Sequence, residues 1–158
     1  MDTQQEDSLF FIQNYLIAPV EQLLESEHYY PLLIYCSLGI ETLGSFLDNK
    51  PLRARQQSKI RFGNALYQLF PNQYGFCNKK SFLYDALRNH SAHNLIPSPH
   101  LSIYPQQKDF KHLSIVEEKT IFCIDIFTQD FLSACKTVKS NISNHIYKAK
   151  HIPIHSFN

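Results

Sequence analysis

The chain has 158 residues, of which 44% are hydrophobic, and it carries 15 Lys and Arg against 14 Asp and Glu. This length supports one hydrophobic core but not two ordinary domains, so we expect a single domain over residues 1–158. The formal net charge of +1 excludes a general electrostatic attraction to nucleic acid or anionic lipid, so any RNA binding needs a local basic patch.

The beginning of the chain is unlike a secretory signal, because it is acidic and polar where a signal peptide is basic and then apolar. No apolar run reaches the roughly 20 residues that a membrane-spanning helix needs. The four cysteines are widely spaced and include no Cys-x-x-Cys pair. We therefore expect reduced thiols, as in a cytosolic protein. We therefore expect a cytoplasmic protein with no membrane partner and no cofactor.

The first part of the chain is expected to be helical, because apolar residues recur in steps of three or four. The predicted helices cover residues 9–23, 32–47, 53–70 and 79–94, with a loop over residues 72–78. Pro19 should kink the first helix or divide it, because proline lacks the backbone donor and clashes with the preceding turn.

The pattern then changes to short runs of β-prone residues over 101–104, 112–116 and 120–124. These runs predict a small β-hairpin or three-stranded insertion at about residues 100–124. Helical periodicity returns from Asp125, which predicts the last helix, and the tail over residues 148–158 is expected to be flexible. The expected fold class is mostly α, a helical bundle of four to five helices with a β insertion before the last helix.

The fourth predicted helix carries the segment with the clearest chemical potential, Arg88-Asn89-His90-Ser91-Ala92-His93. A helical stripe is predicted through Phe82, Ala86, Asn89 and His93. It begins apolar and ends in two polar side chains, which should emerge at the rim of the surface that the helix packs against. The long side chain of Arg88 can reach the same opening.

This segment resembles the signature of the HEPN superfamily, in which Arg, a polar residue, a short spacer and His lie on a late helix of an all-α bundle. Arg88-Asn89-x-x-x-His93 meets that pattern, and the predicted order of elements agrees with the family architecture over roughly residues 8–145. The resemblance implies a metal-independent RNA endonuclease, in which the 2′-hydroxyl attacks the adjacent phosphate and leaves a 2′,3′-cyclic phosphate and a 5′-hydroxyl. It also implies a symmetric homodimer with both motifs facing one cleft, and a toxin or defence effector controlled by an antitoxin or sensor protein.

The side chains suit the reaction that the resemblance implies. His93 can take or give a proton near neutral pH, and Arg88 can hold the extra negative charge of the transition state. Asn89 could orient His93 or a phosphate oxygen by hydrogen bonding. Secondary candidates are His90, for proton transfer, and Glu41, as a partner for Arg88 or as part of the cleft. The candidate contacts to the RNA backbone are Arg53, Arg55, Lys59 and Arg61.

Each of these assignments has a structural alternative. Arg88 could simply pair with Asp85 or with Glu residues elsewhere, and Asn89 and His93 could form a hydrogen-bonding couple at the helix end. His90 alone favours packing or capping, Glu41 could occupy a boundary position, and basic residues on an exposed helix more often contact solvent.

The function has alternatives as well. The second hypothesis is a non-catalytic helical module of the same fold, which dimerises or binds a nucleotide or a protein. Cys77, His90 and His93 supply only part of a zinc-ligand pattern, so no metal site is expected and a metal-dependent His/Cys enzyme has little support.

Overall fold

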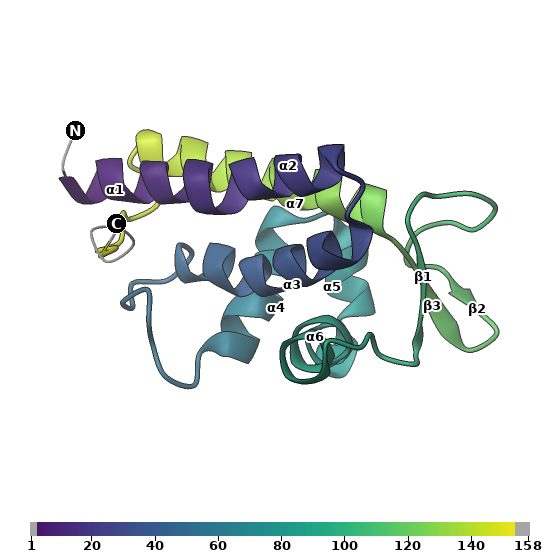
Figure 1. Cartoon of the computed structure of the whole chain (residues 1–158). Helices are drawn as coiled ribbons and strands as arrows, with labels where there is room; N and C mark the ends of the chain where they lie inside the picture. The colour runs from purple at the N-terminus through teal and green to yellow at the C-terminus, as the bar shows by residue number, and fades with distance from the viewer. Residues whose placement is uncertain (1–2, 154–158) are drawn as a thin grey trace.

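In the computed structural model, which describes residues 3–153, helices form the body of the molecule and a three-stranded sheet lies at one end (Figure 1). The elements in chain order are α1 (Thr3–Phe11), η1 (Ile12–Ile17), α2 (Ala18–Glu25), α3 (Tyr29–Ser45), α4 (Ser58–Leu69), α5 (Asn72–Cys77), η2 (Lys79–Ser81), η3 (Tyr84–Asn89), α6 (His90–Asn94), β1 (Leu101–Tyr104), β2 (Ile115–Val116), β3 (Lys119–Cys123) and α7 (Ile124–Ser143). The predicted fold class, mostly α with a small sheet before the last helix, is confirmed.

The division of the first helix at Pro19 takes the form of a π turn rather than a break. α1, η1 and α2 follow one another without a loop, and η1 is π-helical. Because proline has no N–H, the carbonyl of Tyr15, four residues earlier, lacks its α-helical donor. The hydroxyl of Tyr35 on α3 donates to this carbonyl instead. This contact ties α3 to the N-terminal helix at the point that proline disturbs.

The central helix of the bundle is α3, which packs against α2, α4 and α7. The rod formed by α1, η1 and α2 runs beside α7 in the opposite direction (Figure 1). Fully buried side chains of these helices form the core, among them Ile12, Leu33, Ile40, Phe62, Phe127 and Phe131. Burial of each such side chain is worth about 1.5–3 kcal/mol, so packing around α3 is the main stabilising contribution.

Two glycines of α3 allow its neighbours to approach closely. A Cβ atom at Gly44 would lie 2.1 Å from the carbonyl oxygen of Arg61 on α4. A Cβ atom at Gly39 would lie 2.5 Å from Cζ of Phe131 on α7. Carbon atoms pack best at about 3.5–4.0 Å, so any larger residue at these positions would force the helices apart.

The loop between α3 and α4 is held by a buried ionic network. Arg61 is 3% exposed; its Nε donates to Oδ2 of Asp48 at 2.8 Å, and its Nη atoms donate to the carbonyls of Leu52 and Pro51 at 2.6 and 2.8 Å. Lys150 donates through Nζ to the carbonyl of Asp48 at 2.6 Å. Burial acts to raise the pKa of Asp48, but the hydrogen bond and charge of Arg61 outweigh it and hold the pKa below its usual value.

This network corrects two sequence predictions. Arg61 is not available to the RNA backbone, because its donors are all directed into the fold. The predicted flexibility of the tail is wrong at Lys150 and Ile152, which are buried at 5% and 3% exposure. The remainder of that predicted tail, residues 154–158, lies outside the described residues. The partners of Lys150 are about 100 residues away in the chain. Local sequence periodicity cannot predict such distant contacts, so the burial of this part of the tail was not expected.

Helix boundaries differ from the prediction around residues 72–82. The predicted loop over residues 72–78 contains a short helix, α5, which brings the fully buried ring of Tyr74 into the core. The fourth helix begins later than Lys79, because Lys80 and Ser81 have left-handed backbones with φ of 54° and 63°. The left-handed turn at Lys80 and Ser81 delays the start of the fourth helix, and burial of the Tyr74 ring places a short helix where a loop was predicted.

A buried histidine connects the sheet to the helices. β1 pairs with β3 in parallel and β2 pairs with β3 in antiparallel orientation, in the order β1-β3-β2. Nδ1 of His112, in the segment before β2, accepts the N–H of Cys123 at 2.9 Å, and Nε2 lies 2.9 Å from the Tyr74 hydroxyl. That hydroxyl donates to Oδ2 of Asp130 on α7 at 2.8 Å. Because Nδ1 is an acceptor, the proton of the neutral ring lies on Nε2.

The glycine contact predicts a large cost for one added methyl group. Gly44→Ala should lower the free energy of unfolding by about 1–3 kcal/mol, because α3 and α4 must separate to admit it. The matched control is Gly63→Ala on α4, where the new Cβ would meet only Nδ2 of Asn78 at 3.7 Å. Higher helix propensity should make this control stabilising by about 0.5–1 kcal/mol. Equal effects of the two substitutions in urea denaturation would contradict the close approach.

The buried state of His112 predicts a pH dependence of stability. Burial lowers its pKa to about 4, although the nearby Asp125 charge acts to raise it. Between about pH 4 and pH 6.5 the unfolded chain binds a proton that folded His112 does not bind, so the free energy of unfolding should rise with pH across this window. The full contribution is about 3 kcal/mol, present above pH 6.5 and lost as the pH falls to 4.

The substitution His112→Asn tests this dependence, because its side-chain oxygen can still accept the Cys123 N–H but has no imidazole to titrate. Asp125, Asp130 and Tyr74, which face this position, remain in the variant. Urea unfolding from pH 4 to 7 gives the free energy of unfolding at each pH. This free energy should rise less steeply with pH in the variant than in wild type. The exposed His28→Asn is the control, and a wild-type slope in the His112 variant would contradict the expected linkage.

Candidate functional site

The segment Arg88–His93 crosses the junction between a π turn and a short α-helix. η3 is π-helical, and at its end the N–H of His90 donates to the carbonyl of Asp85, five residues earlier. π turns inside α-helices occur frequently at functional sites. The extra residue in such a turn displaces the side chains that follow it, so an α-helical spacing no longer predicts which face they occupy.

The predicted stripe through Phe82, Ala86, Asn89 and His93 is only partly buried in the structure. The positions that point inward in steps of four are Leu83, Leu87 and Ser91, which are buried. Of the predicted stripe only Ala86 is buried; Phe82 and Asn89 are half-buried and His93 is exposed. The candidate residues consequently lie outside the packed face, where an external ligand can reach them.

Arg88 is anchored by one nitrogen, and its other two nitrogens have no partner among the described residues. Its Nε donates to Oε2 of Glu41 on α3 at 3.2 Å, and the two side chains are 25% and 29% exposed. The ion pair considered for Glu41 is thus present, and Asp85 is not the partner of Arg88. Neither Nη atom has a hydrogen-bond partner within residues 3–153. A guanidinium held in this way presents its terminal fork, the geometry that binds a phosphate through two parallel hydrogen bonds.

Two residues that the sequence analysis missed support this arrangement. Ser58 at the start of α4 donates to the same Oε2 of Glu41, and its Oγ accepts the hydroxyl of Tyr84 at 3.1 Å. The guanidinium of Arg88 lies over the Tyr84 ring, 5.8 Å from its centroid. The spacing of Tyr84 and Arg88, four residues on one helix, could have indicated their contact. No local signal indicates Ser58, because it comes from another helix.

Asn89 has a different partner from those expected. Its Nδ2 donates to Oδ1 of Asp85 at 2.9 Å, so the amide is engaged one turn back on its own helix rather than by His93. The contact is exposed, and an amide on an exposed contact can exchange it for a ligand at little cost.

The two histidines of the segment lie in different environments. His93 is exposed and His90 is half-buried, and neither forms a side-chain hydrogen bond or ion pair with the described part of the chain. The helix ends directly after them, because Leu95 adopts a left-handed backbone with φ of 53° and its N–H caps the carbonyl of Ser91. An unpartnered, exposed imidazole can exchange protons with a ligand, but no second group of the described chain fixes its orientation.

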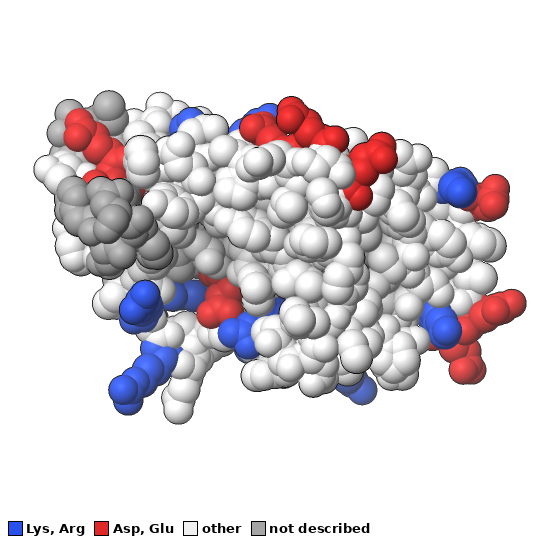
Figure 2. All heavy atoms as spheres, in the orientation of Figure 1, with Lys and Arg blue, Asp and Glu red and all other residues white. Residues whose placement is uncertain are grey.

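The remaining basic candidates divide into two groups. Arg53 and Arg55 are exposed on the loop between α3 and α4, where Figure 2 shows basic side chains gathered below the end of α3. Lys59 is exposed on the first turn of α4, and its Nζ lies 5.7 Å from the centroid of the Tyr84 ring. Lys59 therefore contacts the same ring as Arg88, whereas Arg61 belongs to the buried network.

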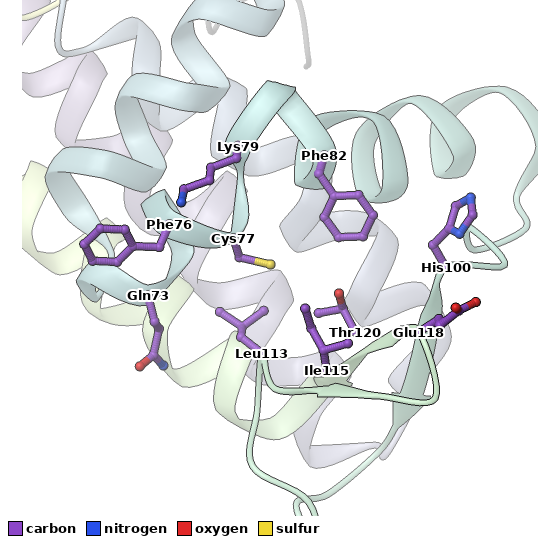
Figure 3. A pocket seen from close by; sticks show the side chains of 10 residues that line it. All are labelled: Gln73, Phe76, Cys77, Lys79, Phe82, His100, Leu113, Ile115, Glu118 and Thr120. Carbon is purple, nitrogen blue, oxygen red and sulfur yellow. The ribbon is translucent and has the colours of Figure 1, made fainter.

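A cavity of about 610 Å³ lies between α5, η2 and the sheet, apart from these residues (Figure 3). Phe82 and Cys77 approach it from the helices, and Leu113, Ile115 and Thr120 approach it from the opposite side. Burial raises the pKa of the Cys77 thiol, which favours the neutral form. None of Arg88, Asn89 and His93 lines this cavity.

No metal centre is formed within residues 3–153, where no cluster of three or more His, Cys, Asp or Glu side chains could hold an ion. The partial zinc pattern of Cys77, His90 and His93 is not brought together there, and the four cysteines are free thiols. In the same range, the helices are too short or too polar to cross a membrane.

Comparisons with known proteins identify no relative, so function is inferred from the site itself. The chain matches no protein-family model, no curated protein and no solved structure. The resemblance to HEPN proteins therefore stays a prediction that rests on the segment Arg88–His93 and the order of the elements.

The two arginines that bind carboxylates should differ in their effect on stability. Arg88→Ala should change the free energy of unfolding by about 1 kcal/mol or less, because its ion pair with Glu41 is partly solvated. Arg61→Ala should cost about 3–5 kcal/mol, because it leaves Asp48 and two carbonyls without their buried donor. Urea denaturation measures both variants, and a cost for Arg88 equal to that for Arg61 would assign Arg88 a structural role.

Proposed function

We propose that this protein is a cytoplasmic, metal-independent RNA endonuclease of HEPN type, with Arg88 and His93 as its catalytic residues. The observation that carries the proposal is the state of Arg88: Glu41 holds Nε, and both Nη atoms are left for a ligand. Phosphate is the ligand that best fits a fixed guanidinium fork. The exposed imidazole of His93 on the same helical segment adds a group that can accept or donate a proton.

The reaction follows from these two groups. A base removes the proton of the RNA 2′-hydroxyl, whose oxygen attacks the adjacent phosphorus and forms a P–O bond. The bond from phosphorus to the 5′-oxygen breaks, and an acid protonates that oxygen, which leaves a 2′,3′-cyclic phosphate and a 5′-hydroxyl. Arg88 stabilises the extra negative charge on the non-bridging phosphate oxygens as the transition state forms. Asn89 can turn its amide from Asp85 to a phosphate oxygen once RNA is bound.

One exposed histidine cannot act as base and acid in the same step, so the proposal includes a homodimer. Two copies related by a two-fold axis would place one His93 on each side of the scissile phosphate. His90 is the other histidine of the segment, but it is half-buried on the first turn of α6. An endonuclease of this kind suits a toxin or defence effector that is restrained by an antitoxin or sensor protein.

A second candidate function is a non-catalytic helical module that binds a nucleotide or protein partner. It is favoured by the lack of any group in the described chain that orients His93, and by the engagement of Asn89 with Asp85. In that case Arg88 would bind a phosphate without any cleavage.

Cleavage of RNA in the presence of EDTA distinguishes the two functions. Arg88→Ala and His93→Ala should each lower the rate of cleavage at least about 100-fold, because each removes a group that acts in the transition state. Mass spectrometry of the products from wild type should identify 2′,3′-cyclic phosphate ends.

The matched control is His28→Ala, which removes an exposed histidine from the loop before α3 and should cleave at the wild-type rate. Circular dichroism and light scattering check that fold and oligomer size are unchanged in each variant. Cleavage that persists in both site variants would exclude this site, and RNA binding without cleavage by the wild type would favour the second function.

A further inference from the structure

Two cationic side chains lie near the Tyr84 ring, and only one of them, Arg88, forms an ion pair within residues 3–153. Nζ of Lys59 and the guanidinium of Arg88 lie 5.7 and 5.8 Å from the centroid of the same ring. Glu41 pairs with Arg88, whereas within residues 3–153 no carboxylate forms an ion pair with Lys59. The other acid of η3, Asp85, accepts the Asn89 amide. Among the described residues, Lys59 is therefore a cation without an ion-pair partner, and it shares the Tyr84 ring with the guanidinium of Arg88.

The ring that the two cations share is fixed by contacts from two other helices. Tyr84 is 8% exposed, packs edge-on against Phe62 and donates its hydroxyl to Oγ of Ser58. Ser58 in turn binds Glu41, which holds Arg88. Lys59 is the next residue after Ser58, so the hydrogen bonds that position Arg88 also position the backbone that carries Lys59. Both cations therefore contact one ring that the fold holds in place.

We infer that Lys59 binds the RNA phosphate next to the one held by Arg88, so that α4 and η3 together form a two-cation clamp on the RNA backbone. This inference rests on the proposed function. The lysine ammonium is a point charge on a flexible stem, so it can follow the variable position of a neighbouring phosphate, whereas the planar fork of Arg88 suits the phosphate that must be held in one geometry. The contribution of Lys59 is therefore to substrate binding and register, and not to the transition state.

Lys59 differs from the other exposed basic candidates in its contact with Tyr84. Arg53 and Arg55 lie on the exposed loop before α4, and Figure 2 shows basic side chains over this loop and toward the start of α4. The loop residues can extend the positive track along the RNA, but they have no contact that fixes them relative to Arg88. Only Lys59 shares a defined partner, Tyr84, with the guanidinium.

The test measures binding apart from cleavage. Fluorescence anisotropy with a labelled 2′-O-methyl oligoribonucleotide, which lacks the attacking hydroxyl, gives the dissociation constant from 50 mM to 300 mM KCl. Lys59→Ala should weaken binding about fivefold near 100 mM salt and reduce the slope of log Kd against log salt by about 0.7, the value for one phosphate contact on a single strand. Lys59→Arg should keep the wild-type slope, because it keeps the charge.

The matched control is Lys136→Ala, which removes an exposed lysine from α7 and should leave affinity and slope unchanged. On cleavable RNA, Lys59→Ala should raise KM about fivefold at the same salt and leave kcat unchanged, whereas a loss of kcat would place Lys59 in the chemical step and overturn the inference. Thermal melting checks that the variant is folded.

The outcomes separate this inference from the proposed function. If wild type cleaves RNA and Lys59→Ala behaves like Lys136→Ala, the clamp is wrong and the nuclease stands. If wild type binds the oligonucleotide without cleaving RNA, and binding depends on Lys59, the clamp stands and the nuclease is wrong. A wild type that neither binds nor cleaves RNA overturns both.

Discussion

The close packing of α3 against two neighbours is the constraint on which the rest of this structure depends. Gly44 leaves room for the backbone of α4, and Gly39 leaves room for a ring of α7. Glu41 lies between these glycines in the chain, on a helix whose position is therefore fixed by contact rather than by loops. The same crossing brings the first turn of α4 to Glu41, so the packing of the core and the placement of Arg88 share one cause.

Two long helical segments of this protein contain a π turn, and the turns have different causes and effects. In η1 the turn precedes Pro19, and Tyr35 supplies the hydrogen bond that the proline cannot donate. In η3 there is no proline, and the turn contains Arg88 and Asn89. The first turn lies in a packed helix, whereas the second contains two half-buried polar residues.

Burial distinguishes Arg61, whose charge has a structural role, from Arg88, whose charge is accessible to a ligand. Both bind a carboxylate, but Arg61 is buried and gives its remaining donors to two backbone carbonyls. Arg88 gives only Nε to Glu41 and remains partly exposed. Removing water from a charge is costly unless every donor finds a partner, so a complete network is required inside the protein and an incomplete one is tolerated at the surface. The free donors of Arg88 are what a ligand can use.

The sequence by itself determined the helical class, the position of the β insertion and the local chemistry of Arg88 and His93, because these follow from apolar periodicity and residue type. It also indicated that Glu41, an acid within an apolar helix, needs a partner. Only the tertiary structure decided which arginine is buried, that Lys150 closes the loop after α3, and that Ser58, Lys59 and Tyr84 surround Arg88. Apart from the contact of Tyr84 with Arg88, which are four residues apart on one helix, these contacts join residues far apart in the chain, so no local pattern encodes them.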